Sequence, residues 1–387
     1  MTRHALEPWL IGLCLVGGCS AAASDVADSQ AAEAGAVDVG ADQLDTDDAA
    51  SIDAAGADAA GADAAGTDAE VQPQLDAAAS GPCTAWATAT QTGVVQSSVG
   101  AGEDAPTLGE LSGLARSHNG WLWAHNDSGE TTARLFLLNP TGQLRAVLTV
   151  PGVVPVDWED IAAGSCGAGF SADKRCLWIG DIGDNAHTRA TVSVVRVLEP
   201  TQQLATALPS ASTVAHWQVP PSDVHITQFQ YPPDGATTAA TLRPDAEALA
   251  VLSDGRLLVA TKRDDGLSRL FRVTPGTGTV VAVLLGTLNV RDPPLEAGLS
   301  LRVTAADLDG DGRLLVRAYF RAWAFDFAAP LTAALPALAP KIAGATRQKL
   351  ETGFDVQGES IASDGHGGFW HTSELENQPL WHILCAP

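Results

Sequence analysis

The chain has 387 residues and a formal net charge of -24, from 46 acidic and 22 basic residues. Fourteen of the acidic residues fall within residues 20–81, which contain no Lys or Arg, so the rest of the chain is only mildly acidic, near -10. Nothing in this composition would neutralise phosphates, which argues against a nucleic-acid partner.

Residues 1–18 predict a signal peptide. Arg3 precedes an apolar run that is too short to span a bilayer, and the run ends in Val16-Gly17-Gly18-Cys19. Small residues directly before a cysteine resemble the lipobox of bacterial lipoproteins, which implies cleavage before Cys19, lipid on its thiol and a membrane partner. The alternative is an ordinary signal peptide with a chance cysteine. Because Ser20 is not the aspartate that marks inner-membrane retention in some bacteria, we expect an exported lipoprotein in the outer membrane or at the cell surface.

Residues 19–81 predict a disordered spacer. They consist mainly of Ala, Gly and Asp, as in "DAAGADAAGADAAGTDAE". Such a segment has almost no large apolar side chains to offset the entropy of ordering, and its like charges repel. A flexible spacer after a lipid anchor would give the remaining domain, residues 82–387, reach from the membrane.

Four cysteines remain in the predicted domain, and an exported chain sits in an oxidising compartment where an even set pairs. Of the three possible connectivities we favour Cys83–Cys385 with Cys166–Cys176, because the first pair brackets the domain and the second flanks one loop. A zinc site is the alternative, but the sequence has no CxxC spacing to support it.

The domain reads as an all-β repeat. Five segments share a short strand of small residues, a tight turn, an apolar strand and a polar loop, and further strands follow most of them. The segments are "GELSGLARSHNGWLWAHNDSG", "VDWEDIAAG…CLWIGDIGDN", "PDAEALAVLSDGRLLVATKRDD", "VTAADLDGDGRLLVRAYFRA" and "VQGESIASDGHGGFWHTSELEN". Four antiparallel strands about every fifty residues predict a five-bladed β-propeller.

The last repeat has only three strands, and the N-terminal "AWATATQTGVV" is the candidate for its fourth. That pairing would close the ring, and the Cys83–Cys385 bridge would staple the seam. A six-bladed ring, with a blade hidden in residues 200–244, is the alternative.

Acidic side chains recur at the start of each first strand, at two positions that share one face. The aligned pairs are Glu110/Ser112, Asp157/Glu159, Asp245/Glu247, Thr304/Ala306 and Gln357/Glu359. The loops after the second strands should open at the same end of the channel. They contribute His125, Asn126, Asp127, Asp181, Asp184, Asn185, Lys262, Arg263, Arg317 and Glu374.

Clustered carboxylates need a countercharge or protonation. Oxygen ligands without cysteine suit calcium or another divalent cation, and no organic cofactor is expected. The alternative is a purely structural role, most of all for Asp157, Asp160 and Asp245. The candidate metal ligands are Glu110, Glu159, Glu247 and Glu359. The candidate catalytic residues are His125, Asp127, Asp181, Lys262 and Arg317, and the candidate substrate-binding residues are Asn126, Asp184, Asn185 and Glu374. "DLDGDG" (307–312) looks like the front of a calcium loop but has Ala318 where the bidentate acid would stand.

Taken together, "HNDSG", "DWEDIA", "GDIGDN", "DAEALAV" and "GESIA" resemble a family of bacterial exported β-propellers of undefined activity, over residues 105–382. More distantly, an acidic propeller channel is similar to calcium-dependent phytases and to lactonases of the gluconolactonase type. These likenesses imply two hypotheses. One is a module that binds a cation, small molecule, glycan or protein on the channel rim. The other is a divalent-metal-dependent hydrolase of an ester, lactone or phosphoester.

Overall fold

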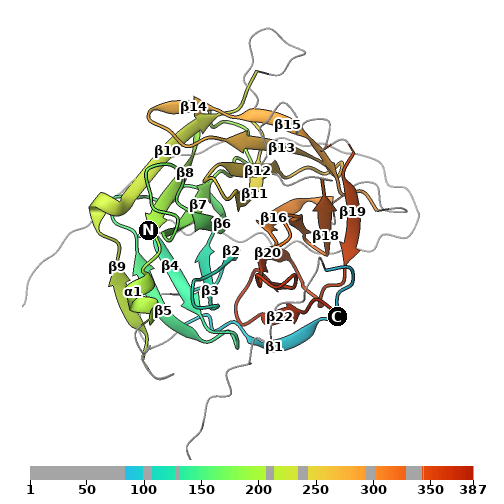
Figure 1. The fold of residues 1–387 in the computed structure, drawn as a ribbon, viewed down its shortest axis with the longest axis horizontal. Coiled ribbons are helices and arrows are strands. Elements are labelled where there is room, and N and C mark those ends of the chain that lie inside the picture. The colour runs from blue at the N-terminus through green and yellow to red at the C-terminus, as the bar shows by residue number, and fades with distance from the viewer. Residues whose placement is uncertain are drawn as a thin grey trace, which may run out of the picture. The chain divides into compact units, whose positions relative to one another are not determined.

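The computed structural model describes residues 83–98, 107–127, 131–205, 213–233, 243–292, 298, 301–327, 342 and 344–386. The predicted signal peptide, Cys19 and the acidic spacer lie outside the described residues. The described strands form five sheets arranged around a central axis as the blades of a β-propeller (Figure 1). The predicted all-β, five-bladed fold is confirmed.

Each blade starts with an innermost strand beside the axis and continues outward through antiparallel neighbours. The first blade contains β2 (Leu111–Arg116), β3 (Leu122–Asn126), β4 (Arg134–Leu138) and β5 (Leu144–Thr149). The second contains β6 (Trp158–Ser165), β7 (Arg175–Asp181), β8 (Val192–Leu198) and β10 (Val224–Gln230). The third contains β11 (Ala246–Val251), β12 (Leu257–Thr261), β13 (Leu267–Val273) and β15 (Val283–Asn289). The fourth contains β16 (Val303–Leu308), β17 (Leu314–Ala318), β18 (Arg321–Asp326) and β19 (Thr346–Leu350).

The fifth blade closes the ring with a strand from the other end of the domain. It contains β20 (Gly358–Ser363), β21 (Phe369–Ser373), β22 (Pro379–Ile383) and β1 (Thr90–Val94). The N-terminal β1 pairs antiparallel with β22, as Figure 1 shows by the blue strand beside the red ones. A disulfide joins Cys83 to Cys385 at this seam, with 5.6 Å between their Cα atoms, and a second joins Cys166 to Cys176. Both predicted pairings are confirmed.

The described part of residues 200–244 does not form a sixth blade. After α1 (Thr201–Ala205), β9 (Ala215–Gln218) adds in parallel to β5 at the outside of the first blade. The short η1 (Pro221–Asp223) then leads into β10, the outer antiparallel strand of the second blade. A further strand, β14 (Thr279–Val281), extends the second blade in parallel to β10. The residues of the supposed extra blade therefore widen two existing blades.

The core is divided among the five interfaces between blades. Each interface holds one apolar cluster, and buried Trp123, Trp158, Trp178, Trp323 and Trp370 lie in these clusters. Small residues are needed nearer the axis. A Cβ on Gly113 would lie 2.4 Å from His125 Nε2 and 2.7 Å from the backbone nitrogen of Ile161. Among the described residues, no helix has the length and apolar character needed to cross a membrane.

Candidate functional site

A β-bulge at the start of each innermost strand aims one side chain into the channel mouth. The register between the first and second strands shifts at the same place in all five blades. Bulges re-aim side chains and are typical of sites next to a cavity. The residues at the shift include Ser112, Glu159, Glu247, Thr304 and Glu359.

The bulge corrects one alignment made from the sequence. Val303 faces Ala318 and Ala305 faces Arg317, so Thr304, not Ala306, occupies the position of the three glutamates. Its hydroxyl donates to Gly358 O at 2.8 Å, while the Ser112 hydroxyl donates to Glu159 O. Thr304 and Ser112 thus each donate a hydrogen bond to the backbone of the next blade. The other three bulge residues are glutamates whose carboxyl groups line the cavity.

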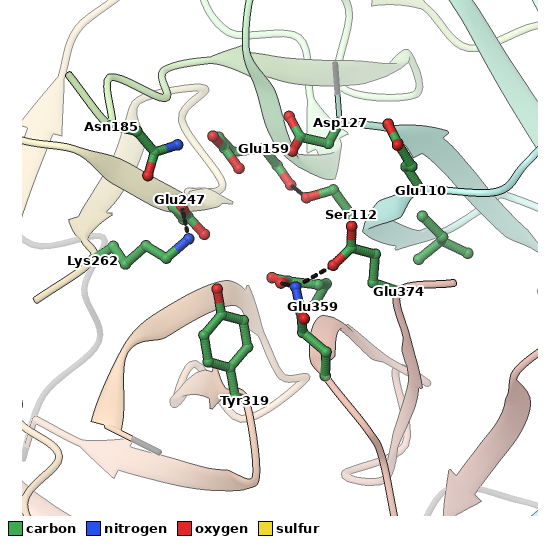
Figure 2. A pocket seen from close by; sticks show the side chains of 12 residues that line it. Glu110, Ser112, Asp127, Glu159, Asn185, Glu247, Lys262, Tyr319, Glu359 and Glu374 are labelled. Atoms are coloured by element: carbon green, nitrogen blue, oxygen red, sulfur yellow. Dashed lines mark hydrogen bonds and ion pairs between the residues drawn. The ribbon is translucent and has the colours of Figure 1, made fainter. Parts of the chain in front are cut away.

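These side chains surround a cavity of about 70 Å³, large enough for an ion and several waters. Six carboxyl groups and one ammonium group line it, and Figure 2 shows them converging from all sides. The lining residues are Glu110, Leu111, Ser112, Asp127, Glu159, Asn185, Glu247, Lys262, Tyr319, Gln357, Glu359 and Glu374. The sequence therefore predicted eight of the cavity residues from its three candidate lists.

The three inner glutamates are almost fully buried and lie close enough to repel one another when charged. Glu159, Glu247 and Glu359 are only 3%, 2% and 6% exposed. Burial raises the pKa of Glu159 well above its usual value, and repulsion from Glu247 raises it further. Burial likewise raises the pKa of Glu359 to about 8. Charged forms buried this close together are disfavoured without a countercharge.

Lys262 supplies one such charge. Its Nζ forms an ion pair with Glu247 and lies 5.4 Å from the centre of the Tyr319 ring. Burial lowers the pKa of Lys262, but the combined effects of Glu247, Tyr319 and Glu359 outweigh burial and raise it, so the ammonium is kept. Burial also raises the pKa of Tyr319 to about 12, so its hydroxyl stays protonated.

On the fifth blade, the Gln357 amide bridges two acids. Its Nε2 donates to Glu359 Oε1 at 3.0 Å and also to Glu374. Burial raises the pKa of Glu374, with a further contribution from the charge of Glu110. Glu247 and Glu359, both predicted metal ligands, thus already have partners inside the cavity.

On the opposite side, three carboxylates without partners lie together: Asp127 and Glu159 line the cavity, and Asp157 lies beside them. One oxygen each from Asp127, Asp157 and Glu159 lies within 4.8 Å of the others. Among the described residues, none donates a hydrogen bond to these carboxylates, and Asp127 Oδ1 is buried without a partner. Burial raises the pKa of Asp127 to about 7. A second group, Glu159 with Asp245 and Glu247, meets the same distance limit, but there Asp245 accepts the Asp184 N–H at 2.9 Å.

Asp160, the residue after Glu159, is fully buried and links three innermost strands. Its Oδ2 accepts the backbone N–H groups of Leu249 at 2.8 Å and Ala306 at 3.0 Å, and Oδ1 accepts that of Ile161. Burial raises its pKa, and the three N–H donors oppose that rise. The structural role expected for Asp160 fits this placement.

The loop "GDIGDN" supports the site more than it lines it. Asp181 pairs with Arg189 at 2.6 Å, and Asp184 accepts the backbone N–H groups of Thr188 and Arg189, each at 2.8 Å. The predicted catalytic role of Asp181 and binding role of Asp184 therefore have no basis in the cavity lining, because both side chains brace the loop. Asn185 does reach the cavity.

Three other candidates lie behind the cavity wall. His125 is fully buried against Trp158, and burial lowers its pKa to about 4. Asn126 Nδ2 donates to Thr107 O at 2.8 Å, and its Oδ1 accepts the Glu110 N–H at 3.1 Å. Neither residue lines the cavity, contrary to the prediction: His125 Nδ1 lies 2.8 Å from Asn126 O, and the Asn126 side chain connects two backbone segments.

Arg317, also a catalytic candidate, is buried in an ion pair with Asp355 and does not line the cavity. Arg263 pairs with Asp265 at 2.6 Å. In "DLDGDG", Asp309 accepts the N–H groups of Asp311 and Arg313 and pairs with the Arg313 side chain at 2.6 Å. That motif is a capped turn.

The candidate lists left out four lining residues, Leu111, Ser112, Tyr319 and Gln357. Asp157 was expected at the channel mouth but not as a metal ligand, with a structural role as the alternative. Asp157 and Gln357 did stand in the aligned pairs, so the strand periodicity carried a signal for them. Tyr319 had only its place in the "RAYFR" loop.

The fold and site together define a five-bladed β-propeller with an acid-lined cavity at its channel mouth. The sequence matches no protein-family model and no curated protein. The PQQ-bound form of aldose sugar dehydrogenase from Streptomyces coelicolor is similar over 78% of this chain and 99% of that one, at 13% identity and a TM-score of 0.41. The apo-form of the soluble aldose sugar dehydrogenase from Escherichia coli covers 77% of this chain and 99% of its own, at 10% identity and 0.39. A protein of unknown function from Bacteroides thetaiotaomicron is similar over 78% of this chain and 77% of that one, at 11% identity and a TM-score of 0.38. TM-scores this low say nothing about the activity of this chain.

Proposed function

We propose that the cavity binds a divalent cation, calcium or magnesium, between Asp127, Asp157 and Glu159. The observation that carries the proposal is the carboxylate of Glu159, which is 3% exposed and accepts no hydrogen bond from any described residue. Buried charges are normally paired or bound to metal. Hard oxygen donors in a cavity with room for water match the preferences of both ions.

The rest of the cavity supports a cation on this wall and not on the opposite one. Glu247 is neutralised by Lys262, and Glu359 accepts the Gln357 amide. A cation would relieve the repulsion that the remaining three carboxylates exert on one another. The predicted ligand set of Glu110, Glu159, Glu247 and Glu359 is thus revised to one that keeps only Glu159.

Elemental analysis of the purified full chain, before and after chelation, tests this proposal alongside melting curves. We expect one calcium or magnesium ion per chain, and stabilisation of about 2.7 kcal/mol when the free ion is at a hundred times its dissociation constant. Glu159→Gln should abolish both effects, and the exposed Glu351→Gln should change neither. A chain that holds no ion and whose melting temperature ignores calcium and magnesium would end the proposal.

Hydrolysis of an ester, lactone or phosphoester is the second candidate function. It is favoured by a carboxyl group in the same cavity that is not among the proposed cation ligands, that of Glu359, whose pKa burial raises to about 8. Such groups can donate and accept protons at physiological pH. Calcium-dependent turnover of p-nitrophenyl acetate, gluconolactone or p-nitrophenyl phosphate that disappears in Glu359→Gln would support it. No turnover of any of the three would leave cation binding alone.

We also propose that the protein is exported and anchored by lipid at Cys19. The lipobox-like sequence supports this, and so do the two disulfides, which form in oxidising compartments. Mass spectrometry of the N-terminal peptide from bacterial membranes should find a lipid-modified Cys19, and Cys19→Ala should release the protein from the membrane. An unmodified Cys19 in mature protein would contradict the anchor.

A further inference from the structure

Six of the described exposed apolar side chains lie at the same end of the propeller as the cavity mouth, Val154 and Val156 on the second blade and four on the fourth and fifth blades. They belong to loops that either follow a second strand or precede a first strand, which are the loops that open at that end. The most exposed of them, Phe354, is 83% exposed. We call the four residues the apolar arc: Phe320, Phe354, Val356 and Leu375.

The arc is the outer edge of the cavity wall on the fourth and fifth blades. Backbone hydrogen bonds of 2.9 Å join its loops, from Gly358 N–H to Tyr319 O and from Glu374 N–H to Gln357 O. Along the chain, each of three cavity residues has an arc residue as its neighbour. The neighbouring pairs are Tyr319–Phe320, Gln357–Val356 and Glu374–Leu375.

The fold holds Phe354 outward. Its neighbour Asp355 is buried in the ion pair with Arg317 and accepts a hydrogen bond from His371 Nδ1 at 2.8 Å. On the other side, Gly353 N–H donates to His371 Nε2 at 3.1 Å. Because both flanking residues are fixed inward, the Phe354 ring is presented to solvent on an anchored backbone and not on a free loop.

Leu375 also points outward, and its backbone adopts an unfavourable conformation there. Its φ of 82° lies in the left-handed region, which disfavours residues with a Cβ. Leu375 is 47% exposed, so its side chain repays this conformation only in part by burial. Beside it, Glu374 lies next to Glu110 on the same side of the cavity, as Figure 2 shows.

We propose that the apolar arc and the Glu110–Glu374 pair dock a segment of another protein that presents Lys or Arg beside apolar side chains. The basic side chain would enter the mouth between the two glutamates while its apolar neighbours cover the arc. Rigid exposed aromatic residues next to a charge-complementary pocket are typical anchors of peptide recognition.

Charge argues against the other occupants. The chain's own segment 20–81 carries fourteen acids and no bases, so the acidic mouth would repel it. A second copy docked face to face would bring two acidic mouths together. An anionic lipid surface would be repelled in the same way. The proposal does not depend on the cation site, which lies on the wall formed by the first two blades.

Selection of random linear peptides displayed on phage, against the immobilised full chain, tests the proposal. We expect selected peptides to share a Lys or Arg next to apolar residues, and their binding to weaken as salt is raised. Phe354→Ser and Leu375→Gly should each weaken a synthetic selected peptide by roughly tenfold or more, as loss of an anchor does. The selection is run with calcium and again after chelation, so failure of the cation site leaves the result readable.

The variants separate docking from folding. Leu375→Gly removes the left-handed strain, so we expect an unchanged or higher melting temperature together with weaker binding. Ile226→Thr, at an exposed apolar residue on the outer strand β10, should leave binding unchanged. The proposal is overturned if no peptide is selected or if selected peptides are not basic. Unchanged binding by both arc variants, or Phe354-dependent binding of the chain to phosphatidylcholine vesicles, would also overturn it.

Discussion

The carboxylate of Asp160 accepts the backbone N–H of Leu249 at 2.8 Å, a hydrogen bond that runs from the second blade to the third. The same oxygen accepts the Ala306 N–H of the fourth blade at 3.0 Å. One buried side chain therefore ties three innermost strands together next to Glu159, a residue of the cavity lining. The acids of the channel fall into two kinds, those satisfied by backbone donors and those left facing the cavity.

Asp160→Asn should destabilise the fold. An amide has one acceptor oxygen, so whichever way it is turned at least one of the three N–H groups loses its partner. Each buried N–H left unpaired costs about 1–3 kcal/mol. Urea unfolding should show a lower midpoint with the same slope. Asp173→Asn, at an exposed acid, is the control, and equal midpoints for the two variants would contradict the bracing role.

Without a divalent cation, the stability of the protein should fall as pH rises from about 4.5 to about 8. Burial raises the pKa of Glu359 to about 8, above its unfolded value, so the folded state holds this proton more tightly. Stability from that proton is fully present below the unfolded pKa and is lost as pH rises through the folded one. Melting temperatures in chelator across this range measure the effect.

Glu359→Gln provides the control for this pH dependence, since it removes the titrating group but keeps the shape. Its pH profile should be flatter than that of the wild type. Calcium should stabilise the wild type more at the alkaline end, where the cavity carboxylates are ionised. A wild-type melting temperature that rises steadily across the range in chelator would contradict the assignment.

The two disulfides should differ in their contribution to stability. Cys83–Cys385 spans 302 residues and Cys166–Cys176 spans 10. Loop-closure entropy gives about 6 kcal/mol for the long loop and about 3 kcal/mol for the short one. Urea unfolding of the paired serine variants, Cys83→Ser with Cys385→Ser and Cys166→Ser with Cys176→Ser, measures the difference. Equal losses would contradict loop-closure entropy as the source of the stabilisation.

The blades could be predicted because their signals are local. Strands of small residues, Asp-Gly turns and apolar second strands recur at a regular spacing, and the missing fourth strand at the C-terminus pointed to β1. The error at Thr304 has a local cause as well. The first strands were aligned on their small residues, and Thr304-Ala305-Ala306 offers three of them in a row, so the alignment chose Ala306, two positions beyond the residue that occupies the site.

The site was harder to predict, because spacing places a carboxyl group on a loop but does not say what it accepts. Asp181 and Asp184 stand in the same kind of loop as Asp127, yet both are bound by Arg189 or by backbone N–H groups. Asp127 faces the cavity without a partner. The difference depends on contacts between residues that the sequence does not bring together.

Gly183 shows how closely the "GDIGDN" loop packs on the proposed cation site. A Cβ at this position would lie 2.0 Å from Glu159 Oε1 and 2.5 Å from Asp157 Oδ2. Any other residue must therefore push apart two of the three carboxylates that would hold the ion. The glycine acts through these side chains and would not itself touch the cation.

Gly183→Ala should accordingly weaken cation binding more than it weakens the fold. Residues that orient metal ligands typically change affinity by about 10–100-fold. Calorimetric titration of the variant with calcium gives the affinity, and urea unfolding in chelator gives the stability. Gly276→Ala is a matched control, because a Cβ there would make only an ordinary contact of 3.4 Å with Val280. If Gly183→Ala bound calcium as tightly as the control, Asp157 and Glu159 could not both be ligands, and the cation would have to be assigned to the group of Asp245 and Glu247.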